Sequence, residues 1–256
     1  MIELLLPIFG FLIGTVASMI GIGGGVFIVP LLALLYGFSP AQAVGTSLTT
    51  IIFTSLASTA NYSKQKRIYY KIGLILAITT IPGAILGAYL TSIIQQRLLG
   101  LTFGVFLIFV ALRMIFRLNL SKTQSIISSE HMMLENKKKV WLGLALSFFG
   151  GLSSGLLGIG GGALLVPIMN LAMGMTMHVT TATSMFTMIF TSTSGVVQHL
   201  SLGHVNLESA LLLAVGTIFG AQLGAYGSKK ISGGNLRRIF GLVLIIISIR
   251  MILKYA

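Results

Sequence analysis

The sequence contains no cysteine and no aspartate, and only 8% of its 256 residues are charged. The lack of cysteine excludes disulfides, thiolate metal sites and thiol catalysis. Without aspartate, no Ser–His–Asp triad can form. Soluble domains carry about 25% charged residues, whereas this chain is 55% hydrophobic with a mean hydropathy of +0.99. It is therefore predicted to be an integral membrane protein.

Charge is also missing from the middle of every hydrophobic run. A cation carrier usually has an intramembrane carboxylate, and none is present here. The four histidines are scattered at spacings that suggest no metal site. No acid–base pair is available for an enzyme, so we expect no catalytic residues, no metal and no cofactor.

The net charge of +13 comes from lysines and arginines that lie in loops between hydrophobic runs. In a soluble protein this excess would suggest nucleic acid. In a membrane protein, loop cations set the orientation and contact anionic lipid head groups. We therefore expect the lipid bilayer, and not nucleic acid, as a partner, and a homo-oligomer stays open.

One ten-residue pattern occurs twice, at residues 21–30 and 158–167. Each copy reads GIGGG, then four apolar residues, then proline. Each glycine costs a helix roughly 1 kcal/mol relative to alanine, and proline removes a backbone donor. The two copies therefore predict broken or re-entrant helices at matching places.

The pattern belongs to an internal duplication with an offset of 137 positions and no gap over about a hundred residues. At this offset Thr46-Ser47 matches Thr183-Ser184. Hydrophobic runs of helical length fill both halves. The predicted fold is all-α, with two membrane repeats of about five helical segments each, at residues 1–117 and 140–256, joined by a cytoplasmic linker at 118–139.

Loop charge predicts how the repeats are oriented. The loop at 62–71 carries four cations, whereas its counterpart at 199–206 carries none. Placing 62–71, 113–139 and 228–238 in the cytoplasm puts 14 of the 17 basic residues inside, as the positive-inside rule favours. The repeats then have inverted topology, both termini lie outside, and the protein is multi-pass in the cell (inner) membrane. Inverted repeats are typical of secondary transporters.

The glycine breaks are the first candidate binding site. Backbone N–H groups beyond each break would be free and, with the helix dipole, would attract an anion. The alternative is close helix packing through small residues. The candidate residues are Gly23, Gly24, Gly25, Gly160, Gly161 and Gly162.

Two hydroxyl-rich helices follow the breaks. Several of their hydroxyls share one helical face at spacings of three and four, and such a face could line a polar pathway and donate to an oxyanion. The alternative is back-bonding and helix–helix contact. The candidates are Thr46, Ser47, Thr50, Thr54, Thr183, Ser184, Thr187 and Thr191.

Two single residues complete the candidate site. His178 opens the second hydroxyl-rich helix, and because histidine titrates near neutrality it is the candidate proton carrier; the alternative is an interfacial histidine. Gln222 lies between the small residues of Gly220-Ala221-Gln222-Leu223-Gly224-Ala225. It is either a substrate contact or a cross-helix contact.

The doubled GIGGG-x4-P, each copy followed by Thr-Ser, resembles the TauE/SafE sulfite-exporter family. The two Gly-Ala-x-x-Gly-Ala copies, at residues 83–88 and 220–225, fit it as well. The resemblance covers nearly the whole chain outside the central linker. It implies a multi-pass permease for sulfur-containing anions such as sulfite, sulfonates or thiosulfate. Phe219 in place of a second Pro82, and Gly195 in place of a second Ser58, depart from two-fold symmetry.

Together these observations predict a secondary transporter that moves a small sulfur oxyanion across the cytoplasmic membrane. The resemblance to sulfite exporters implies that the direction is export. The site would lie where the glycine breaks meet the hydroxyl-rich helices. An anion channel or a non-transporting membrane sensor is the alternative function.

Overall fold

The computed structural model describes residues 5–115, 136–228 and 234–256, with the side chains of 234–239 left out. Within these ranges the chain is helical and has no strand. Most of the predicted linker, residues 118–135, and most of the basic loop at 228–238 lie outside the described residues or their described side chains.

In residues 5–115 the structure has the helices α1 (Leu6–Ile20), α2 (Gly25–Leu35), α3 (Pro40–Lys64), α4 (Tyr70–Ile93) and α5 (Gln96–Ile115). The start of α3 shows why helices begin where they do. Ser39 accepts a hydrogen bond from the Gln42 N–H, and the Gln42 side chain accepts one from the Ser39 N–H. This capping box satisfies two end donors, and Pro40 at the first helical position needs none.

The second half repeats this order with α7 (Lys137–Leu157), α8 (Gly162–Pro167), η3 (Ile168–Ala172), α9 (Met177–Ser201), α10 (Leu207–Gly227) and α11 (Gly234–Tyr255). The helix α7 begins inside the range predicted as linker, because the Asn136 side chain caps it by accepting from the Lys139 N–H. The short helix α8 continues as the π-helix η3, whereas its counterpart α2 is one regular helix.

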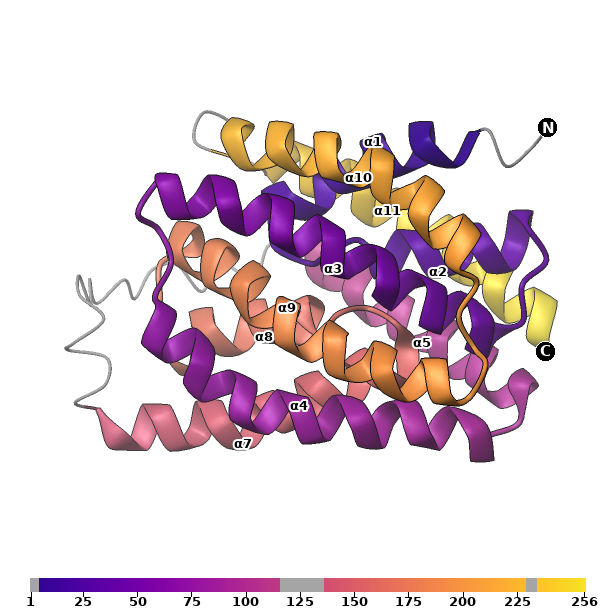
Figure 1. Cartoon of the computed structure of the whole chain (residues 1–256), viewed down its shortest axis with the longest axis horizontal. Helices are drawn as coiled ribbons and strands as arrows, with labels where there is room; N and C mark the ends of the chain where they lie inside the picture. The colour runs from indigo at the N-terminus through magenta and orange to yellow at the C-terminus, as the bar shows by residue number, and fades with distance from the viewer. Residues whose placement is uncertain (1–4, 116–135, 229–233) are drawn as a thin grey trace.

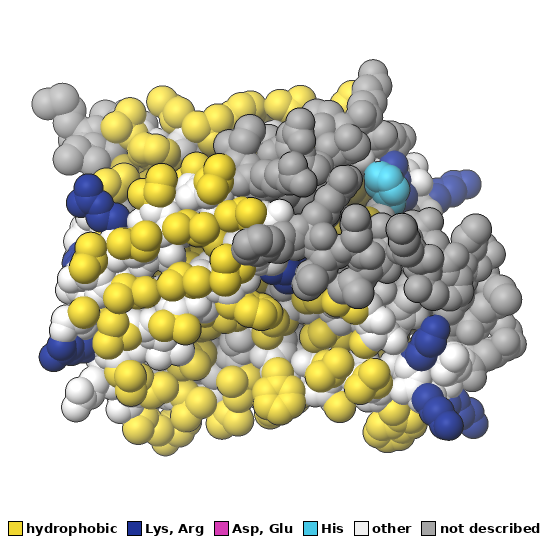
Figure 2. All heavy atoms as spheres, turned by 180° about the vertical axis from the view of Figure 1, so that it is seen from behind, with side chains coloured by type: hydrophobic (Ala, Val, Ile, Leu, Met, Phe, Trp, Pro, Cys, Tyr) yellow, Lys and Arg dark blue, Asp and Glu magenta, His cyan; other side chains and the backbone are white. Residues whose placement is uncertain are grey.

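Among the described residues, five helices are long and apolar enough to cross a membrane: α3, α4, α5, α7 and α10. Large apolar side chains face outward from them, among them Ile78 and Phe219, which are about two-thirds exposed. Figure 2 shows hydrophobic side chains over much of the described part of one face, with most lysines and arginines toward its ends. Lipid covers such a surface, so the predicted all-α membrane fold is confirmed.

The two halves interlock (Figure 1). Helix α1 packs along α10 of the other half, and its counterpart α7 packs along α4. Helices α3 and α9, which are counterparts, pack against each other, as do α5 and α11. A Cβ on Gly220 or Gly224 would collide with the backbone of α1, and one on Gly83 or Gly87 with that of α7. The Gly-Ala-x-x-Gly-Ala segments are therefore helix-packing faces.

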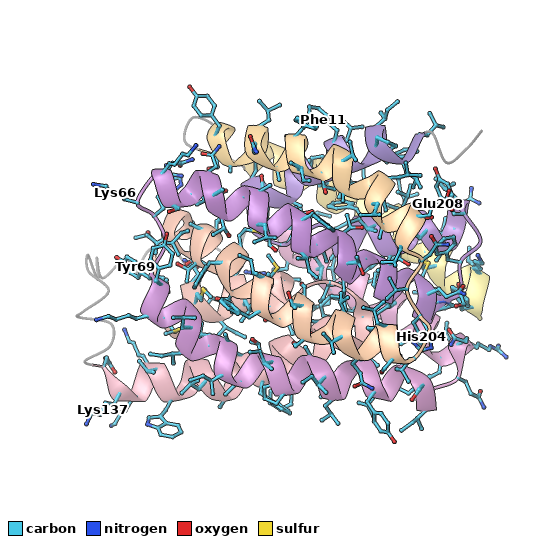
Figure 3. All side chains as sticks on the ribbon, viewed as in Figure 1. Phe11, Lys66, Tyr69, Lys137, His204 and Glu208 are labelled. Atoms are coloured by element: carbon cyan, nitrogen blue, oxygen red, sulfur yellow. The ribbon has the colours of Figure 1, made fainter. Side chains whose placement is uncertain are left out.

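Matching loops of the two halves lie at opposite ends of the molecule. Figure 3 shows Lys66, Tyr69 and Lys137 at one end, and His204 and Glu208 at the other. The loop between α3 and α4 thus lies far from its counterpart between α9 and α10. The inverted-repeat prediction requires this arrangement.

Candidate functional site

Glycine is needed in both breaks because of their backbone angles. In the first break Gly21, Gly23 and Gly24 have φ of +83°, +79° and +99°. The counterparts in the second break have φ of +68°, +72° and +82°. Residues that carry a side chain rarely adopt these left-handed φ values. The GIGGG pattern therefore ends one helix and starts the next within four residues.

The two breaks cross in the interior of the protein. A Cβ on Gly25 would collide with the Gly158 carbonyl oxygen and lie 2.6 Å from the Ile159 Cα. In the mirror contact, a Cβ on Gly162 would lie 2.6 Å from the Gly21 carbonyl oxygen. All ten residues of the two GIGGG stretches are buried. Backbone thus meets backbone across the two repeats, which only glycine permits at these positions.

Two hydroxyls hold the crossing together. The Ser47 Oγ donates to the Gly158 carbonyl over 2.8 Å, and the Ser184 Oγ donates to the Gly21 carbonyl over 2.9 Å. Each serine belongs to one repeat and each carbonyl to the other. Both serines were candidate site residues from the sequence, and in the structure they contact the breaks directly.

The crossing also contains unpaired backbone donors. The Gly24 carbonyl accepts from Phe27 and Ile28 at the start of α2, but the preceding N–H groups have no acceptor within the described residues. The second break repeats this pattern. Buried N–H groups without partners are rare and costly. The crossing brings several of these hydrogen-bond donors together. The nine unpaired donors are the N–H groups of Gly23, Gly24, Gly25, Val26, Ile159, Gly160, Gly161, Gly162 and Ala163.

Two apolar side chains that were not predicted from the sequence, Ile51 and Met188, pack against glycines of both breaks. A Cβ on Gly23 would lie 2.9 Å from the Met188 Sδ and 3.2 Å from the Ile51 Cγ2. One on Gly160 would meet the same two side chains at 3.1 and 2.9 Å. Ile51 and Met188 are repeat counterparts and fully buried. Among so many hydroxyls they look like ordinary core residues, and only the offset of 137 pairs them.

The threonine near the start of each hydroxyl-rich helix accepts a hydrogen bond from a loop of the other repeat. The Thr46 hydroxyl accepts from the Asn206 N–H over 3.0 Å. Its counterpart Thr183 accepts from the Tyr69 N–H over 3.0 Å. Each threonine therefore ties its helix to the loop before α10 or α4 of the other repeat.

The remaining predicted threonines make helix contacts. All four donate to the carbonyl four residues earlier. Three also reach the neighbouring α10 or α4. The structure thus brings these hydroxyls to helix–helix interfaces, with a lined pathway left as a prediction. The contacts are Thr50 to the Ala210 carbonyl, Thr187 to the Gly73 carbonyl, Thr191 to the Thr80 hydroxyl, and Thr54 within its own helix alone.

Gln222 and His178 are not brought to the crossing. Both are exposed. Gln222 is two positions from both Gly220 and Gly224, so when those glycines face α1 its side chain turns to the opposite side of the helix. His178 lies in the first turn of α9, more than a helical turn before Ser184.

The C-terminal end of α1 and of α7 each has a buried side-chain cap, and neither cap was predicted from the sequence. Tyr62 Oη donates to the Ser18 carbonyl over 2.7 Å, and His199 Nε2 lies 2.9 Å from the Gly155 carbonyl. Tyr62 and His199 are repeat counterparts and fully buried. These carbonyls lie in the last turns of α1 and α7, where the breaks remove the usual helical donor.

Comparison with known proteins agrees with this architecture. The family described as Sulfite exporter TauE/SafE matches residues 6–251. The chain is 36% identical to the probable membrane transporter protein YunE of Bacillus subtilis (strain 168), over 97% of this chain and 96% of that protein. It is 29% identical to the probable membrane transporter protein MJ0441 of Methanocaldococcus jannaschii, over 97% and 95%.

A plant protein matches over a shorter stretch. Sulfite exporter TauE/SafE family protein 6 of Arabidopsis thaliana is 36% identical over 108 residues, which are 42% of this chain and 25% of that protein. No solved structure matches the chain. Because the family match spans both repeats and both glycine breaks, the chain belongs to the TauE/SafE sulfite-exporter family and is a multi-pass membrane transporter, not an enzyme.

Proposed function

We propose that this transporter is a secondary carrier that exports a small sulfur-containing oxyanion, of the sulfite, sulfonate or thiosulfate class, across the cytoplasmic membrane. The observation that carries the proposal is the set of nine buried N–H groups without acceptors at the crossing of the breaks. An oxyanion offers several oxygen acceptors at once, and the N-terminal ends of α2 and α8 favour negative charge.

The charges around the crossing suit an anion. Glu208, the one glutamate among the described residues, is exposed at an end of the molecule. A guanidinium lies close to the second break, because Arg113 Nη1 donates to the Ala163 carbonyl in the first turn of α8 over 3.1 Å. Donors that are mostly neutral hold an anion without a buried counter-charge, so the anion can also be released.

The side chains over the breaks favour a carrier over a channel. Ile51 and Met188 are fully buried and touch the space of both Gly23 and Gly160. An open channel needs a continuous wet path, whereas these apolar side chains close the crossing in the described conformation. Substrate entry would then require α3 and α9 to move apart, as alternating access demands.

We further propose that the end with Lys66 and Lys137 faces the cytoplasm. Figure 3 places both residues at the same end. Arg67 joins them there, since its Nη1 contacts the Ser228 Oγ at the end of α10 over 3.3 Å. A cluster of cations at one end of a membrane protein favours the cytoplasmic side. The C-terminus lies at the other end (Figure 1) and would then face the outside of the cell.

Reporter fusions test this orientation. Reporters at residues 65 and 232 should show a cytoplasmic location, and a reporter at residue 203 should show an external one, because the loops that carry residues 65 and 203 lie at opposite ends. Alkaline phosphatase and a fluorescent protein at each position give complementary signals. Residues 65 and 203 on the same side would refute the inverted orientation.

Flux into liposomes tests the carrier proposal. Purified protein should transport sulfite, thiosulfate or a sulfonate with saturable, gradient-coupled kinetics, and sulfate serves as the comparison anion. Flux that does not saturate, at far higher rates, would mean a channel. Absence of flux for every anion would leave a sensor.

A proline substitution tests the backbone donors directly. Val26→Pro removes one unpaired N–H at the second position of α2, where no protein hydrogen bond is lost; Pro7 already occupies that position in α1. We expect a charge-assisted hydrogen bond of about 1.5–3 kcal/mol to be lost, which lowers affinity by tenfold or more. Val26→Ala keeps the N–H and is the control. Equal anion affinity in both variants, at equal melting temperature, would contradict the proposed donors.

A further inference from the structure

A pair of histidines joins the second break to one end of the molecule. His199 Nδ1 and His204 Nδ1 are 3.3 Å apart, and His199 Nε2 lies 2.9 Å from the Gly155 carbonyl oxygen. Gly155 is in the last turn of α7, directly before the break. His199 is fully buried, whereas His204 is partly exposed in the loop before α10. The pair thus forms a continuous polar contact from that end to the break.

The hydrogen bonds fix how the protons are arranged. A carbonyl oxygen only accepts, so His199 Nε2 carries a hydrogen and donates to Gly155. Neutral His199 then has a lone pair on Nδ1. His204 must therefore donate from its own Nδ1, which leaves His204 Nε2 as the free basic nitrogen of the pair. This nitrogen belongs to the residue nearer the end of the molecule.

No other titratable side chain contacts the pair among the described residues. Helix α3 contributes Gly45, helix α4 contributes the Thr91 hydroxyl, 3.5 Å from His204 Nδ1, and α7 contributes the Gly155 carbonyl. Burial lowers the pKa of His204 from its ordinary value of 6.5. The two rings therefore act mainly on each other.

The first repeat has no such proton site. The counterparts of His199 and His204 are Tyr62 and Arg67. Tyr62 caps the Ser18 carbonyl as His199 caps Gly155. A tyrosine hydroxyl and a guanidinium keep their protons throughout the neutral range. The two repeats thus share the cap but differ in whether it titrates.

We propose that His199 and His204 form a proton-binding site that couples proton uptake at one end of the transporter to anion binding at the second glycine break. This proposal rests on the proposed anion function. It assigns the proton-carrying role to this pair in place of the exposed His178.

The proton would move in a balanced relay. A proton binds His204 Nε2, and the Nδ1 proton of the resulting imidazolium passes along the hydrogen bond to His199 Nδ1. His204 is then neutral with its proton on Nε2, and His199 carries both ring protons. The charge now lies beside the C-terminal end of α7, which stabilises a cation. It also lies next to the break, where it attracts an anion; by linkage, a bound anion favours the proton equally.

Thermal unfolding tests the proton site without any substrate. Because the pKa of His204 is lowered in the folded protein, its neutral form contributes stability above pH 6.5, and this stability is lost as the pH falls below that value. The melting temperature of the wild type should fall by about 2–4 °C more than that of a non-titrating variant between pH 8 and pH 5. His199→Tyr copies the cap of the first repeat, and His204→Asn keeps a donor toward His199.

The histidine in the first turn of the same helix provides the comparison. His178→Asn should keep the pH profile of the wild type, and His204→Asn should lose it. His199→Tyr leaves the partly buried His204 in place and should keep the part of the profile that His204 contributes. Identical profiles in the wild type and both pair variants would overturn the proposal. So would loss of the profile in His178→Asn alone.

Flux separates this proposal from the anion function. Thiosulfate and methanesulfonate are the probes, because sulfite itself takes up a proton near neutrality. With equal pH on both sides, wild-type flux should rise by up to about tenfold per pH unit of acidification, and flux through His199→Tyr should be flat. If no anion moves at any pH while the unfolding profiles differ as expected, the anion function fails and the proton site stands. Pair variants that keep the wild-type flux profile would refute the coupling.

Discussion

Replacing Gly25 with alanine is expected to abolish anion flux and to lower the melting temperature markedly. The new Cβ would collide with the Gly158 carbonyl oxygen and lie 2.6 Å from the Ile159 Cα, and both are backbone atoms that cannot rotate away. Gly25 does not have a left-handed φ, so the effect measures the crossing of the breaks and not backbone strain. The cost should reach or exceed the upper end of the about 1–3 kcal/mol typical of overpacking. Flux and thermal unfolding on the same preparation check it.

Two further glycines make this prediction specific. Gly162→Ala should behave similarly, because its Cβ would lie 2.6 Å from the Gly21 carbonyl oxygen and 2.8 Å from the Ile22 Cα. Gly227→Ala is the control, since nothing lies within 4 Å of its Cβ position, and it should change stability by no more than about 0.5 kcal/mol. Normal flux through Gly25→Ala would show that the two breaks do not touch during transport.

Replacing Gly224 with valine should force α1 away from α10 and strongly destabilise the fold. Its Cβ would collide with the Thr15 carbonyl and the Ser18 hydroxyl of α1, and valine adds two methyl groups to that collision. A loss of about 3 kcal/mol corresponds to a drop of about 6–12 °C in melting temperature for a chain of this size. Thermal unfolding and the yield of monodisperse protein measure it.

The adjacent residue supplies the matched control. Leu223 is 53% exposed, so Leu223→Val should leave folding unchanged. Gly87→Val in α4 should fail as Gly224→Val does, since its Cβ would collide with the Leu152 carbonyl of α7. Equal stability of Gly224→Val and Leu223→Val would mean that α1 does not pack on this face.

The helical fold and the two breaks could be predicted from the sequence because both depend on local chemistry. Hydrophobic runs of membrane length predict helices whatever their neighbours are. Three nearby glycines predict a break in the same way, and Gly21–Gly24 separate α1 from α2 as expected. The start of α7 was misplaced by a few residues, since a cap such as Asn136 is one side chain in a polar stretch.

The candidate site was only partly predictable, because most of its contacts join residues far apart in the sequence. Ser47 and Ser184 were found from the repeat, yet their bonds to Gly158 and Gly21 span more than a hundred positions. Ile51 and Met188 have no local signal at all. Gln222, for which a substrate contact and a cross-helix contact were both left open, is exposed. In a helix with small residues on several faces, composition does not reveal which side faces the neighbour.

The interlocking of the halves has a consequence for how the chain is made. Helix α1 leaves the ribosome first, but its main partner is α10: the Ser18 hydroxyl donates to the Ala221 carbonyl, 203 positions later. Contacts of such sequence separation form late. Until α10 is synthesised, the face of α1 that packs against Gly220 and Gly224 has only lipid beside it. A truncated or stalled chain keeps that face open, and α10 of a neighbouring copy can fill it, which makes domain swapping the competing route of assembly.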